Sequence, residues 1–102
     1  MRALPKYSVS RPGQSDLRAI ARYTHETWGV DQAVRYAQGL QRSFRVLAEN
    51  PGIGRPCDAI QAGLRRFEVG KHVVFYREKP GGIRIVRVLH QQMIPAKSRF
   101  KQ

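Results

Sequence analysis

The spacing of apolar residues in the first half of the chain predicts a short strand followed by two amphipathic helices. Tyr7 and Val9 alternate with polar residues, which indicates a strand ending at Arg11-Pro12-Gly13. A helical stripe follows, made of Leu17, Ile20, Ala21, Thr24 and Trp28. A second stripe runs from Asp31 to Asn50-Pro51 and contains Ala33, Tyr36, Ala37, Leu40, Phe44, Leu47 and Ala48. Because Gly29 leaves a tight connection, we expect an antiparallel helical hairpin with Trp28, Tyr36 and Phe44 as core residues.

The second half of the chain has the alternation and punctuation of an antiparallel sheet. After a loop over Asn50 to Gly63, three strands are predicted over Leu64 to Val69, His72 to Glu78 and Ile83 to His90. In the last of these, strict alternation places Ile83, Ile85 and Leu89 on one face and Val86 and Val88 on the other, so we expect a central strand covered on both sides.

The order of these elements predicts an α+β fold. It consists of an N-terminal strand and an antiparallel two-helix hairpin packed on a mainly antiparallel four-stranded sheet. Since one hairpin can cover only one face, the other apolar face is expected to need a partner. We assign residues 1–92 to this domain and residues 93–102 to a basic, flexible C-terminal tail.

The charge of the chain narrows the classes of partner. Its 102 residues fit one domain, and their formal net charge is +12. Solubility alone needs a charge of only about 2 to 8 in a small domain. The excess is larger in the second half of the chain and favours an anionic partner such as nucleic acid, ribosome or an acidic protein.

Several classes of site and location are disfavoured. The lone Cys57 excludes an internal disulfide, and no pair of histidines has helical metal-ligand spacing, so we predict no metal and no other cofactor. No apolar run approaches the ~20 residues that span a bilayer, and the N-terminus lacks a signal-peptide pattern. We expect a cytoplasmic protein without membrane contact or a small-molecule ligand.

The candidate partner-binding residues are basic and lie mostly on the predicted strands: Arg55, Arg65, Arg66, Arg77, Arg84, Arg87 and His90. Arg65 and Arg66 point to opposite faces, so at least one is expected to be free for a partner unless Glu68 or Asp58 pairs with it. Arg87 is expected either to be half-buried and paired or to lie at a groove rim. Arg55 is also explained by bonds to loop carbonyls, and His90 by a structural role at a strand end.

A set of short motifs resembles the ParE branch of the RelE/ParE toxins. They are Tyr23 with Trp28-Gly29, Ala33-Val34-Arg35-Tyr36, Glu49-Asn50-Pro51, Gly54-Arg55-Pro56, Gly63-Leu64-Arg65, Val69-Gly70, Phe75-Tyr76-Arg77 and Arg87-Val88-Leu89-His90. The resemblance implies a cytoplasmic bacterial toxin neutralised by a ParD-like antitoxin. It also implies that the target is DNA gyrase with its DNA, trapped by protein contact without chemistry by the toxin.

The RelE branch, whose members cut mRNA on the ribosome, is the enzymatic alternative. Metal-free RNA cleavage needs a proton acceptor, a cation at the phosphorane-like transition state and an acid for the leaving oxygen. Arg65, Arg77 and Arg87 are candidates for the cation and His90 for the acid or base. Ribosome-dependent relatives carry a tyrosine near the C-terminus, whereas the segment after His90 has none. We therefore predict a toxin that is not an enzyme.

Overall fold

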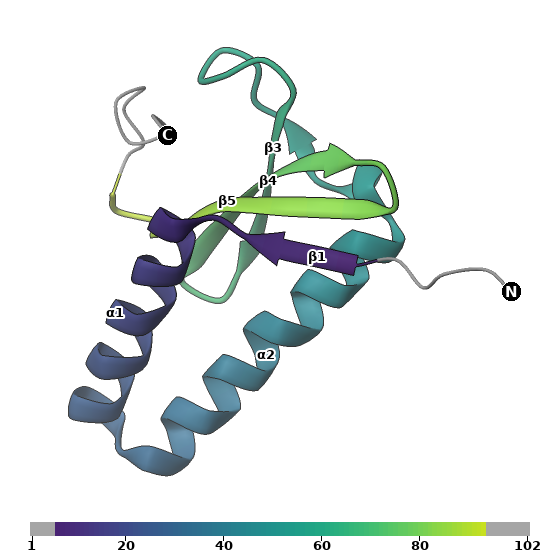
Figure 1. Cartoon of the computed structure of the whole chain (residues 1–102). Coiled ribbons are helices and arrows are strands. Elements are labelled where there is room, and N and C mark those ends of the chain that lie inside the picture. Colours follow the sequence, from purple (N-terminus) through teal and green to yellow (C-terminus); the bar gives the residue numbers. More distant parts are fainter. Residues whose placement is uncertain (1–5, 94–102) are drawn as a thin grey trace, which may run out of the picture.

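The structure is a computed structural model that describes residues 6–93. Figure 1 shows its elements along the chain. They are β1 (Lys6–Val9), α1 (Arg11–Trp28), α2 (Val30–Glu49), a 3-10 helix η1 (Pro51–Ile53), β2 (Arg55–Pro56), β3 (Leu64–Val69), β4 (His72–Lys79) and β5 (Gly82–His90). The predicted tail at 93–102 lies outside the described residues, apart from Met93.

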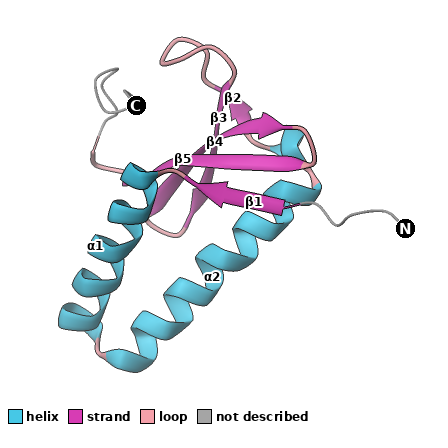
Figure 2. Ribbon diagram, viewed as in Figure 1, coloured by secondary structure: helices cyan, strands magenta, loops and turns pink. Residues whose placement is uncertain are grey.

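One mixed sheet carries all the strands (Figure 2). Its order is β1-β5-β4-β3-β2, with β1 parallel to β5 and the other neighbours antiparallel. The α+β fold with a helical hairpin is confirmed. The sheet has a fifth strand, because two residues of the predicted loop, Arg55 and Pro56, pair with Arg66 and Arg65.

The helical hairpin begins immediately after β1. Ser10 caps α1 by accepting a hydrogen bond from the Gly13 amide at 3.0 Å, and Pro12 occupies the first turn, where its missing N–H costs nothing. Gly29, at a φ of 90°, separates α1 from α2. Figure 1 shows that this junction lies far from the sheet, so the hairpin projects outward from it.

The main core lies between the hairpin and one face of the sheet. It contains Leu40, Phe44, Leu47 and Ala48 of α2 together with Val74, Tyr76, Ile83, Ile85 and Val88 of the sheet. Trp28 is not part of it, because its position at the end of the projecting α1 leaves it 64% exposed. The expectation that Trp28 closes the hairpin over the sheet is wrong.

A β-bulge changes the faces of β5. Phe75 pairs with Arg87 but the next residue, Tyr76, pairs with Ile85, so Val86 is an extra residue without a cross-strand partner. The alternation therefore holds as far as Val86 and changes after it. Val88 lies on the helix side with Ile83 and Ile85, and Val86 and Leu89 pack on the opposite side. The predicted face assignments of Val88 and Leu89 are wrong for this reason.

The face of the sheet opposite the helices, here called the outer face, has a small core of its own. Leu64, Val73, Phe75, Val86 and Leu89 are each at most 3% exposed there. Cys57 and Ile60, from the loop between β2 and β3, pack against them. The expectation that this apolar face needs a partner is therefore wrong. Within residues 6–93, no helix is long and apolar enough to cross a membrane.

Candidate functional site

The largest exposed aromatic side chains lie beside two adjoining hollows between the hairpin and the end of the sheet. One hollow of about 310 Å³ is lined by Tyr23, Thr24, Trp28, Gln32, Tyr36, Gly70, Lys71, His72 and His90. The other, of about 280 Å³, is lined by Asp16, Ala19, Ile20, Tyr23, His72, Val88, Leu89, His90 and Met93. They share Tyr23, His72 and His90, and together we call them the hairpin groove. Tyr23 is 63% exposed and Met93 41% exposed, so the groove has accessible apolar surface.

A cluster of three rings forms the floor of the hairpin groove. Tyr36 of α2 and His72 of β4 are joined by a hydrogen bond of 2.5 Å between the hydroxyl and Nδ1. The same hydroxyl accepts from the Lys71 amide and donates to the Val69 carbonyl, both at 3.3 Å. His90 lies directly across from His72, and their rings make an edge contact with centroids 5.4 Å apart. This cluster ties α2 to the turn between β3 and β4.

The environment of the cluster sets its protonation. Burial, and next the neighbouring His90, lower the pKa of His72 below its usual 6.5. Burial raises the pKa of Tyr36 above 10.0, although the hydrogen bond from the Lys71 amide opposes this. Near neutral pH both groups are uncharged, so they offer hydrogen bonds without the desolvation cost of an ion. An apolar groove with uncharged polar groups at its floor suits a peptide segment more than a charged small molecule.

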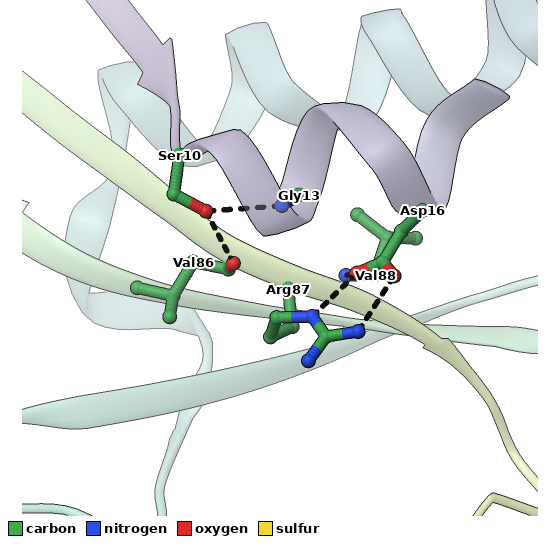
Figure 3. A network of polar contacts seen from close by, with 6 residues as sticks. All are labelled: Ser10, Gly13, Asp16, Val86, Arg87 and Val88. Carbon is green, nitrogen blue, oxygen red and sulfur yellow. Dashed lines mark hydrogen bonds and ion pairs between the residues drawn. The ribbon is translucent and has the colours of Figure 1, made fainter. Parts of the chain in front are cut away.

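Arg87, one of the predicted binding residues, is engaged within the chain. Its Nε and Nη2 donate to the two carboxylate oxygens of Asp16, each at 2.7 Å, and Asp16 also accepts from the Val88 amide at 2.9 Å. Figure 3 shows this network beside Ser10, whose hydroxyl donates to the Val86 carbonyl at 2.6 Å. The hydrogen bond to Asp16 raises the pKa of Arg87. The paired alternative for Arg87 is confirmed.

The network in Figure 3 also has a role in the sheet. β1 pairs with β5 only as far as Ile85, where the chain turns into α1. Beyond that point the side chains of Ser10 and Asp16 bond the backbone of Val86 and Val88. They thereby provide hydrogen-bond partners for backbone groups of β5 that β1 does not reach, and they fix the start of α1 against β5.

Arg55 and Arg66 share one carboxylate on the outer face. Glu68 accepts from Arg55 at 2.9 Å and forms an ion pair with Arg66 at 3.1 Å. Partial burial acts to raise the pKa of Glu68, but the hydrogen bonds from both arginines outweigh it and lower that pKa. Arg66 also lies over the Phe75 ring, 5.7 Å from its centroid. The alternative of an ion pair with Glu68 is confirmed for Arg66, and Arg55 bonds Glu68 as well.

The other three arginines are held by neutral groups. On the helix side, Arg65 donates to the Gly54 carbonyl at 2.7 Å and so holds the η1 loop. On the outer face, Arg77 donates to the Ala62 carbonyl at 2.5 Å and to the Gln61 side chain. Arg84 donates to the Ser8 hydroxyl at 3.2 Å. The hydrogen bond to a loop carbonyl that was suggested for Arg55 is thus made by Arg65, on the neighbouring strand β3.

The four residues considered for RNA cleavage do not form one cluster. Arg65 and Arg77 point to opposite faces of the sheet, and Arg87 is paired with Asp16. His90 lies at the end of β5, where its Nδ1 accepts from the Gln92 amide at 3.1 Å. Among residues 6–93, no group of three or more His, Cys, Asp and Glu side chains is placed to hold a metal ion.

Sequence reasoning missed most of the hairpin groove. From the sequence, Tyr23 is named only within a motif, Trp28 and Tyr36 are predicted to be core residues, and His72 is named only as the start of a strand. The spacing of Tyr23 and Trp28 along α1 does not distinguish a core stripe from an exposed one. The signal in the sequence is the length of the helices: both are much longer than the predicted strands, so the end of the hairpin must extend past the sheet and leave its side chains exposed.

Comparisons with known proteins place the chain among bacterial toxins. Residues 7–95 match the family described as ParE toxin of type II toxin-antitoxin system, parDE. The chain is 47% identical over 89 residues to Toxin ParE1 of Caulobacter vibrioides, covering 85% of this chain and 90% of the relative. It is 45% identical to Toxin ParE1 of Mycobacterium tuberculosis, with 86% and 91% covered. Toxin ParE of Escherichia coli is 31% identical, with 85% of each chain covered.

A solved structure has the same fold. The chromosomal ParDE TA system from P. aeruginosa contains a chain that superposes with a TM-score of 0.72, covering 85% of this chain and 96% of that one. The sequence identity is 23%, so this likeness supports the fold alone.

Proposed function

Because the chain belongs to the ParE toxin family of type II toxin–antitoxin systems, we propose that it inhibits DNA gyrase by protein–protein contact and is neutralised by a ParD-like antitoxin. The observation that carries the proposal is the match to ParE toxins over nearly all of the described chain. The description of the matched family, a toxin of a type II toxin-antitoxin system, supports a protein antitoxin as the partner. The toxin would act in the bacterial cytoplasm without a cofactor.

The hairpin groove is the proposed antitoxin site. Its exposed aromatic residues, Tyr23 and Trp28, are the residue types that anchor protein interfaces. Lys71 lines the groove, and the whole chain carries a net charge of +12. An amphipathic antitoxin segment with an apolar face and acidic flanks complements these features, since apolar contacts supply affinity and opposite charge speeds encounter.

The placement of the basic residues supports contact over catalysis. A transition-state cation must be free to approach a phosphate, but Arg87 is paired with Asp16 and Arg65 is held by the Gly54 carbonyl. Arg77 and Arg65 are also separated by the thickness of the sheet. Of the three described arginines considered for RNA cleavage, none is therefore placed to act with His90 on the same phosphate.

A supercoiling and cleavage assay with purified gyrase tests the proposal. We expect the toxin to stop supercoiling and to accumulate cleaved plasmid, and we expect the cognate antitoxin to prevent both. Cleavage of ribosome-bound mRNA is measured in parallel with the same preparation. Unimpaired gyrase together with cut mRNA would overturn the proposal in favour of the RelE-type activity.

A further inference from the structure

Four cationic side chains form a strip across three adjacent strands of the outer face. Tyr7 and Val9 pack toward the helices, so alternation directs Lys6 of β1 to the outer face. The same alternation places Arg84, between Ile83 and Ile85, and Arg77 and Lys79, beyond Tyr76, on that face. We call Lys6, Arg77, Lys79 and Arg84 the basic strip. β1, β5 and β4 are hydrogen-bonded neighbours in this order, so the strip is continuous.

The charges of the basic strip lack carboxylate partners within the described part of the chain. Arg77 and Arg84 lie directly opposite each other, an arrangement in which like charges repel. Their hydrogen-bond partners are a carbonyl, an amide side chain and a hydroxyl, all uncharged. Glu78 pairs with Ile83, whose side chain faces the helices, so its carboxylate projects to the other face.

The other cross-strand arginine pair on this face shows the contrast. Arg55 and Arg66 are also directly opposite each other, but Glu68 binds both and neutralises their repulsion. Arg77 and Arg84 keep the repulsion, which an external anion would relieve. A like-charge pair that no carboxylate of the described chain neutralises therefore indicates an anionic ligand.

The surroundings of the strip favour phosphates over an acidic protein. Stable protein interfaces are anchored by buried aromatic or large apolar residues. Among the described residues, the exposed large apolar side chains lie on the helices and beside them, and at Met93 after β5. The strip has none, and its neighbours include Ser8 and Gly82. Cations spaced along and across strands without an apolar anchor suit the repeating charges of a nucleic-acid backbone.

We propose that the basic strip binds the phosphate backbone of nucleic acid without reading its sequence. This surface is on the opposite side of the sheet from the main core and is separate from the antitoxin site proposed above. The inference does not depend on gyrase as the target, because it concerns direct contact between this chain and nucleic acid.

The test compares two variants with the same net charge. Lys79→Gln with Arg84→Gln removes two charges of the strip, and neither side chain bonds the loop that Arg77 holds. Arg42→Gln with Arg45→Gln removes two exposed charges from α2 and serves as the control. Binding of a short fluorescent DNA duplex of mixed sequence is measured by anisotropy, without gyrase, over about 50 to 200 mM NaCl. Thermal melting of both variants checks that they are folded.

For the strip variant, we expect Kd to rise about tenfold and the slope of log affinity against log salt to become shallower by about 2, since each phosphate contact contributes about 0.9. The control should change both quantities much less. Equal losses in the two variants would overturn the proposal and indicate binding by overall charge. Unchanged DNA binding with weaker antitoxin binding would also overturn it, because the strip would then belong to a protein interface. Either failure leaves the gyrase assay unaffected.

Discussion

Replacing Asp16 by Asn is the sharpest test of how α1 is fixed to the sheet. The Asp16 carboxylate accepts two hydrogen bonds from Arg87 and one from the Val88 amide. The side chains of Arg87 and Asp16 are only 18% and 13% exposed. Asn preserves the size of the side chain and one acceptor oxygen, but it removes the negative charge that pairs with the guanidinium of Arg87.

The expected loss follows from this partial burial. Removing one partner of a fully buried ion pair costs about 3–5 kcal/mol. Since Arg87 keeps some contact with water and Asn can still accept from Val88, we expect a loss of about 2–3 kcal/mol in the free energy of unfolding. For a domain of this size, that loss lowers Tm by about 10–20 °C.

Urea unfolding at neutral pH measures this loss, with Glu68→Gln as the matched control. Glu68 also bonds two arginines, but its side chain is 41% exposed and that of Arg55 is 70% exposed. We therefore expect the control to lose less than about 1 kcal/mol. A double-mutant cycle with Arg87→Gln isolates the Asp16–Arg87 coupling. Equal losses in the two single variants, or a coupling near zero, would refute the reasoning.

Three further predictions concern the core, the titrating cluster and the groove. Gly54→Ala should destabilise the fold by about 2 kcal/mol in urea unfolding, because the added Cβ overlaps the buried Tyr76 hydroxyl, whereas Gly52→Ala, with nothing within 4 Å, should have little effect. Burial lowers the pKa of His72, so as the pH falls the unfolded chain takes up the proton before the folded chain does. The free energy of unfolding should therefore be constant above the unfolded pKa of about 6.5 and should decrease as the pH drops through it. His72→Gln should reduce this decrease. If stability is unchanged between about pH 7 and 5 in the unmodified protein, that assignment is wrong. Trp28→Ala should weaken binding of the cognate antitoxin about 30-fold in calorimetry, with less than about 1 kcal/mol lost in stability; unchanged affinity would exclude Trp28 as an anchor.

The regular elements could be predicted because their determinants are local. The apolar stripe of α2, the turn at Gly29 and the alternation within β3 and β4 each lie within a few residues of sequence. The bulge at Val86 could not be predicted, because it depends on how β5 pairs with β4. No turn-forming residue marks its position in the sequence. This shift explains why the predicted face assignment is right as far as Val86 and wrong for Val88 and Leu89.

The candidate site was harder to predict because its contacts are long-range. Arg87 and Asp16 are separated by most of the chain, and no spacing rule joins a residue of the first helix to one of the last strand. The choice between a paired and a free arginine was therefore undecided from sequence. The loop cover of the outer face was also missed, since Cys57 and Ile60 lie in a segment without regular structure.

The most direct measurement of the central claim is a titration of toxin against a fixed amount of gyrase in the supercoiling reaction. If the toxin acts by binding, inhibition should saturate at a fixed molar ratio of toxin to gyrase, and cleaved DNA should accumulate. In a parallel titration that also contains the antitoxin, supercoiling should be restored. Full supercoiling at a large excess of toxin, with ribosome-bound mRNA cut by traces of it, would contradict the account.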